Sequence, residues 1–270
     1  MNPASRELYA SIAVALARLE QPRISDEAVH ETRKALKKGR AALRLLRPGL
    51  DPAAYRAEDA LLRDASRCLS PLREPKSMLD ALVALRERNP EAPGRVGLER
   101  MTKSLRSARA KAKRELAGRR AALDQCIRLL KHSLARAEQA DFAGIGSEAL
   151  AGGMRRIYRK GRLALADARK TRAPEALHEW RKQTKYLLNA LETLYGAQMG
   201  KAKTTAKRAE KLSNRLGDDR DLDALGRRAQ ALPGLQTLIA RRRAKLQKQA
   251  FSLGKKLYVE KPKSFVKRIS

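Results

Sequence analysis

The chain has 270 residues, 43% of them hydrophobic, which is enough for one large domain or two halves of ordinary size with a real core. Its 61 Lys and Arg exceed its 29 Asp and Glu, which gives a net charge of +32. Mutual repulsion among these positive charges destabilises the compact state unless an anionic partner neutralises them. Only 4% of residues are aromatic, which argues against a protein that stacks successive nucleic-acid bases on aromatic rings.

The N-terminal segment, residues 1–22, predicts a helix rather than a signal peptide, because Arg18 and Glu20 interrupt its apolar stretch. No run approaches the roughly 18 apolar residues that a membrane span requires. Cys68 and Cys126 lie in helical patterns without metal-like spacing, so we expect small core side chains. The sequence thus predicts a soluble, cytoplasmic protein with no transmembrane segment.

Hydrophobic periodicity predicts an all-α fold. Apolar residues recur at intervals of three and four almost throughout, and the alternation typical of strands is nearly absent. Gly and Pro divide the chain into about ten helical segments. The longest runs from about Leu98 to Ala140, with Gly118 as a point of interruption because Gly disfavours a helix interior by about 1 kcal/mol relative to Ala.

An internal repeat is the most informative feature of the sequence. EAVHETRKALKKGRAALRLL from Glu27 recurs from Glu175 as EALHEWRKQTKYLLNALETL, with ten of twenty positions identical. A weaker match continues downstream, between the segments that begin at Leu69 and Leu216. We therefore expect two related helical halves, about 4–140 and about 147–258, followed by a basic tail at 259–270.

The repeated helix is predicted to carry a cationic strip on one face. With about 100° per residue, His30 and the cations that follow it share one side, while Val29, Leu36 and Leu43 occupy the other. The second copy keeps His178, Arg181, Lys182 and Lys185 but has Tyr186, Leu188, Asn189 and Glu192 where further cations would extend the strip. We therefore expect the first copy to carry most of the affinity for a ligand.

A row of Arg and Lys suits a flexible polyanion, because Arg offers paired donors and Lys offers mobile point charges. Histidine adds a donor whose protonation is favoured by nearby phosphate. An isolated basic helix face is usually only a solvated surface. The recurrence of His at the same phase in both halves favours a ligand-binding function.

The H-E-x-R-K-x-x-K pattern at His30 and His178 resembles the conserved-histidine α-helical domain, or CHAD domain, over about residues 4 to 258. The resemblance implies two pseudo-symmetric four-helix bundles around a basic central groove or pore. It also implies binding of inorganic polyphosphate and association with polyphosphate granules.

Candidate polyphosphate-binding residues follow from the motif and the helical projection: His30, Arg33, Lys34, Lys37, Lys38, Arg40, Arg44, His178, Arg181, Lys182 and Lys185. Further candidates at helical spacing are Arg106, Arg109, Lys113, Lys207, Lys211, Arg215 and Arg220. For Arg220, beside acidic residues, a structural ion pair is favoured over a ligand contact.

Three alternatives remain. A nucleic-acid-binding basic protein is the first, and weak, salt-sensitive nucleic-acid binding is expected in either case. A polyphosphate or triphosphate hydrolase is disfavoured, because the sequence has no phosphate-binding Gly-Lys loop and no clustered carboxylates, so we predict no catalysis, cofactor or metal. An adaptor that recruits proteins to granules is compatible with the main hypothesis, and the sequence does not identify such partners.

Overall fold

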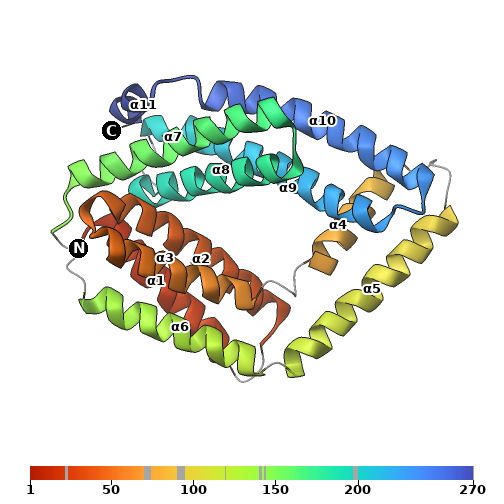
Figure 1. Ribbon diagram of the computed structural model, residues 1–270, viewed down its shortest axis with the longest axis horizontal. Helices are drawn as coiled ribbons and strands as arrows, with labels where there is room; N and C mark the ends of the chain where they lie inside the picture. Colours follow the sequence, from red (N-terminus) through yellow and green to blue (C-terminus); the bar gives the residue numbers. More distant parts are fainter. Residues whose placement is uncertain are drawn as a thin grey trace.

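The computed structural model describes residues 1–21, 24–69, 74–89, 95–118, 120–139, 142, 144–196 and 200–269. Over these ranges the chain forms eleven α-helices and two short 3-10 helices, with no strand (Figure 1). The all-α prediction is confirmed. None of the described helices is both long and apolar enough to cross a membrane.

One group of helices, at the lower left of Figure 1, contains α1 (Pro3–Leu19), α2 (Asp26–Leu46), α3 (Pro52–Cys68) and α6 (Arg120–Gln139). The side chains of Asn2, Ser25 and Asp51 accept hydrogen bonds from the first-turn amides of α1, α2 and α3, and so fix where these helices begin. A Cβ at Gly39 would lie 3.1 Å from the Ser11 Cβ, so this glycine lets α1 approach α2 closely.

The second group, along the top of Figure 1, contains α7 (Ser147–Thr171), α8 (Pro174–Tyr195), α9 (Lys203–Arg228) and α10 (Pro233–Leu257). Trp180 on α8 is fully buried and stacks on Phe251, with ring centroids 5.2 Å apart. A Cβ at Gly254 would overlap the Trp180 ring. The tryptophan therefore anchors α8 against α10.

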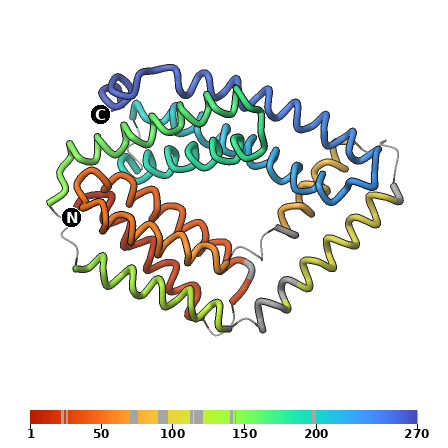
Figure 2. Tube along the Cα trace, in the orientation of Figure 1, coloured from red at the N-terminus to blue at the C-terminus, as the bar shows by residue number. Residues whose placement is uncertain are grey.

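The prediction of one long helix over 98–140 is wrong. The chain forms α5 (Arg95–Gly118) and then α6, and the two helices diverge (Figure 2). Leu105 of α5 is buried in a small apolar cluster with α4 (Glu74–Glu87), α9 and α10, whereas Leu130 of α6 belongs to the main core. Helix α5 ends at Gly118 because α5 and α6 pack into different cores. Glycine disfavours a helix interior, so ending the helix there loses little helix stability.

The two groups of helices meet along α2. The main core runs without a break through both groups, and α2 contacts both α7 and α8. A Cβ at Gly153 on α7 would overlap the backbone of Leu45, so this glycine permits a close crossing. The short helix η1 (Arg47–Gly49) continues α2 and also contacts α7. This crossing brings the two repeated helices, α2 and α8, together.

The C-terminal segment, expected as a basic tail, contains a docked helix, α11 (Pro262–Ile269). Its Phe265 is fully buried and stacks on Tyr158 of α7, with ring centroids 3.9 Å apart. Both cysteines are free, with Cys126 buried and Cys68 partly buried.

Candidate polyanion-binding groove

A groove of about 710 Å³ lies between α2, α8 and α9. The first repeat lines it with His30, Arg33, Lys34, Lys37 and Lys38. The second repeat contributes Arg181, Lys185, Leu188, Asn189 and Glu192, and the remaining lining residues are Gly196, Glu210 and Asn214. Residues that are about 150 positions apart in the sequence thus surround one cationic space.

The α2 strip faces this groove because the other side of α2 is core. Leu36 and Leu43 are fully buried. The Arg33 guanidinium donates a hydrogen bond to the Ser66 carbonyl at 3.3 Å, which restrains it. Lys34 has a side chain 58% exposed and lies 3.5 Å from Glu31, a loose surface pair that leaves its ammonium free to reorient.

The α8 wall is more deeply set. Burial lowers the pKa of Lys185. The positive charges of Arg181 and Lys34 lower it further, whereas the carboxylates of Glu192 and Glu210 raise it. Arg181 lies against α9, where a Cβ at Gly217 would come within 3.2 Å of its guanidinium. An anion in the groove would favour the charged form of Lys185 and offset the like-charge repulsion.

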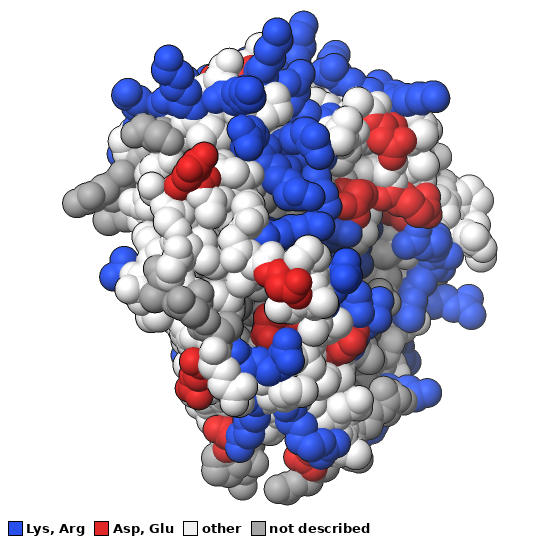
Figure 3. Space-filling model, turned by 60° about the vertical axis from the view of Figure 1, so that its left-hand side comes forward, with Lys and Arg blue, Asp and Glu red and all other residues white. Residues whose placement is uncertain are grey.

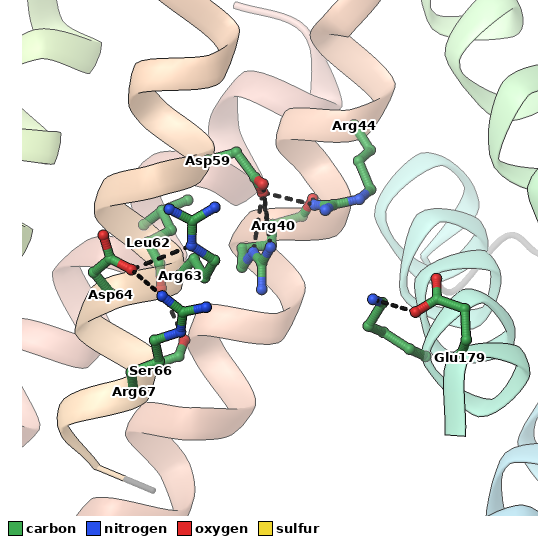
Figure 4. Close-up of polar contacts among 10 residues, drawn as sticks. Arg40, Arg44, Asp59, Leu62, Arg63, Asp64, Ser66, Arg67 and Glu179 are labelled. Atoms are coloured by element: carbon green, nitrogen blue, oxygen red, sulfur yellow. Dashed lines mark hydrogen bonds and ion pairs between the residues drawn. The ribbon is translucent and has the colours of Figure 1, made fainter. Parts of the chain in front are cut away.

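Arg40 and Arg44, both on the predicted strip, do not line the groove. Arg40 and Arg44 lie 3.0 and 3.1 Å from the Asp59 carboxylate of α3 (Figure 4). The Arg44 guanidinium also lies over the Tyr186 ring, 3.9 Å from its centroid. Burial would raise the pKa of the Asp59 carboxyl, but the two arginines lower it overall. These two cations therefore have partners inside the fold.

His178 and Lys182, in the second copy of the motif, also lie outside the groove lining. Lys182 forms an ion pair with Glu179 one turn before it (Figure 4). Burial, followed by the charges of Arg220, Arg181 and Lys182, lowers the pKa of His178 to about 4, although Glu179 opposes the shift. His178 is therefore neutral in the ligand-free protein near neutral pH.

Comparison with known proteins identifies the family of the chain. The family model described as the CHAD domain matches residues 8–230. The chain belongs to the CHAD family. The crystal structure of the CHAD domain from the plant Ricinus communis has a TM-score of 0.56 and 17% sequence identity to this chain, and the match covers 96% of this chain and 93% of that one. That likeness concerns the fold alone, and no curated protein matches the chain.

Among the further candidate cations of this CHAD domain, those with described side chains do not line the groove. Arg106 and Arg109 lie on α5, and the side chain of Lys113 falls outside the described ones. Lys207 and Lys211 are exposed on α9, Arg215 lies 3.8 Å from Asp218, and Arg220 is exposed on the same helix. The α9 side chains that do line the groove, Glu210 and Asn214, carry no repeat or charge pattern that would have singled them out.

Proposed function

We propose that this CHAD domain binds inorganic polyphosphate without cleaving it. The observation that carries the proposal is the groove, where the His30 to Lys38 strip of α2 meets Arg181 and Lys185 of α8. Two carboxylates, Glu192 and Glu210, share that lining with six Lys and Arg residues, so the groove has a cationic excess. A chain of phosphates supplies closely spaced negative charge to match it.

The side chains suit different parts of that task. Arg33 and Arg181 can pair two donors with one phosphate, while Lys34, Lys37 and Lys38 can follow a chain without a fixed register. Asn189 and Asn214 add neutral polar groups to the walls. We propose that the groove residues make the direct contacts, and that His178, Lys182, Arg40 and Arg44 act from its flanks.

The residues available for catalysis support binding without hydrolysis. Within the described ranges, no group of three or more His, Cys, Asp or Glu side chains is placed to hold a metal ion. Phosphoryl transfer relies on charge stabilisation together with a positioned nucleophile or base, and the groove offers mainly the first. By the family resemblance, we propose that polyphosphate binding retains the protein at polyphosphate granules.

Nucleic-acid binding is the second candidate function, favoured by the net charge of +32. A competition titration separates the two, with long-chain polyphosphate and duplex DNA competing at about 150 mM salt, where contacts to duplex phosphates are already weakened. We expect polyphosphate to win by orders of magnitude. Equal affinities would leave a generic cationic surface and move nucleic acid to first place.

A further inference from the structure

A second basic recess, of about 930 Å³, lies where α11 meets α7 and η1. Its cations are Arg155, Arg156, Arg159, Lys261 and Lys263, and the other lining residues are Pro48, Gly152, Pro262 and Ser264. None of these described lining residues is acidic. Figure 3 turns this end of the molecule forward and shows Lys and Arg gathered over its upper and central part.

The fold holds the walls of this recess in place. Phe265 stacks on Tyr158, and Arg162 of α7 donates a hydrogen bond to the Glu260 carbonyl at 2.8 Å. These contacts fix the first turn of α11, and with it Lys263, against α7. Arg155 and Arg159 are one helical turn apart, so they present their side chains on the same face.

The recess cations lack a carboxylate partner within the described part of the chain, where no ion pair joins any of the five to Asp or Glu. Glu260, next to Lys261 in sequence, is engaged by Arg268 at 2.9 Å instead. Like charges held together in this way destabilise the compact state, and an anion in the recess would relieve that repulsion.

The recess begins where α2, which lines the groove, ends. Lys38 of α2 lines the groove and Pro48 of η1, which continues α2, lines the recess, and ten residues at an α-helical rise span about 15 Å. Lys160 on α7 lies close to cations from both sides. Burial lowers its pKa, the charges of Arg44, Arg47 and Arg156 lower it further, and the charge of Glu179 raises it. Positive charge therefore continues from the end of α2 to the recess.

We propose that the recess is a second phosphate-binding site, occupied by the same polyphosphate chain that the groove holds. This inference rests on the proposed function. One chain that reaches both sites binds the second site intramolecularly, so its affinity exceeds that for either site alone. A short oligophosphate that fills one site gains nothing from the other. The domain should therefore discriminate between chain lengths.

The test compares tripolyphosphate with long-chain polyphosphate on the full chain carrying Arg155→Glu and Arg159→Glu. A second variant, Lys261→Glu with Lys263→Glu, alters the other wall. The matched control is Lys245→Glu with Lys248→Glu, the same charge change at two exposed positions on α10 that line neither site. We expect both recess variants to lose about tenfold in long-chain affinity and less than about twofold in groove affinity for tripolyphosphate.

Unchanged long-chain affinity in both recess variants would overturn the second site and leave the groove intact. Equal losses for tripolyphosphate and long chains would also overturn it, because the substitutions would then act on the groove or on the fold. A wild-type protein that binds neither ligand would instead refute the proposed function itself.

Discussion

The two copies of the repeated helix share ten of twenty residues but serve different purposes in the fold. On α2, Lys38 is partly buried at the groove and Arg40 pairs with Asp59. The equivalent residues of α8, Tyr186 and Leu188, are buried. The first copy has cations at these two positions, whereas the second copy has apolar and aromatic side chains that are buried against neighbouring helices. A repeated motif can therefore diverge in burial while some of its shared residues, Arg33 with Arg181 and Lys37 with Lys185, still meet in one groove.

The substitutions in α8 are not a simple loss of binding residues. The Tyr186 ring supports the Arg44 guanidinium of α2, an arrangement that stabilises a cation through the face of the ring. Leu188 and Asn189 remain in the groove wall. The second copy thus supports a side chain of the first while its Arg181 and Lys185 remain in the groove lining.

The largest expected effect concerns the anchor of α8. Trp180 and Thr32 occupy equivalent positions of the repeat, and both are fully buried. Trp180→Ala should lower the free energy of unfolding by about 3–5 kcal/mol, because it leaves a large cavity beside Phe251. Thr32→Ala removes one buried methyl group and a hydroxyl that donates to the Ala28 carbonyl, and should cost about 1–2 kcal/mol.

Urea unfolding without ligand measures both losses. Similar losses in the two variants would mean that α8 is no more deeply anchored than α2. That result would contradict the inference that the second copy is specialised for packing.

The next expected effect concerns binding. Lys34→Glu with Lys37→Glu should weaken polyphosphate binding about a hundredfold, because two charge-assisted contacts become repulsive. Lys182→Glu with Lys185→Glu should weaken it only about tenfold, since Lys182 is paired with Glu179 and lies outside the groove lining. Titration with long-chain polyphosphate measures the difference, and Lys245→Glu with Lys248→Glu again controls for net charge.

The free energy of unfolding without ligand should change little in these groove variants. Each variant relieves like-charge repulsion but loses one surface ion pair, Lys34 with Glu31 or Lys182 with Glu179, which is worth about 1 kcal/mol or less. If the two groove variants bind equally weakly, the α2 strip does not dominate. A large fall in stability would show that the ion pairs of the replaced lysines contribute more to the fold than ordinary surface pairs do.

Sequence predicted the parts of this molecule that depend on local periodicity. The helices and the strip from His30 to Lys38 follow from residues spaced along one segment, and the repeat indicated that Arg181 and Lys185 belong with them. Partners from elsewhere in the chain were not predictable. Asp59 has no pattern that links it to Arg40 and Arg44, and α9 brings Glu210 to the groove only through tertiary packing.

The recess could not be predicted from the sequence for a similar reason. Lys261 and Lys263 were expected in a tail, because the stack of Phe265 on Tyr158 depends on a contact across about a hundred residues. The division of α5 from α6 was marked by Gly118, but only the separate cores decide that the helix ends there.

The smallest expected effect is a pH dependence at His178. Its folded-state pKa of about 4 is below the ordinary 6.5, because of burial and of Arg220, Arg181 and Lys182. Between those values the unfolded chain binds more protons than the folded one, so stability falls as pH decreases through that window. The side chain is only partly buried and solvent screens these charges, so we expect an effect of about 1 kcal/mol, which His178→Gln should remove.

The same group can report on the groove. Polyphosphate beside Arg181 would offset one of the charges that depress the pKa of His178, so an NMR titration of the imidazole should give a higher pKa with ligand than without it. By linkage, binding should then strengthen as the pH falls toward the raised value. An imidazole pKa that is identical with and without ligand would place the phosphate chain away from the α8 wall, and would leave the α2 strip as the sole contact surface.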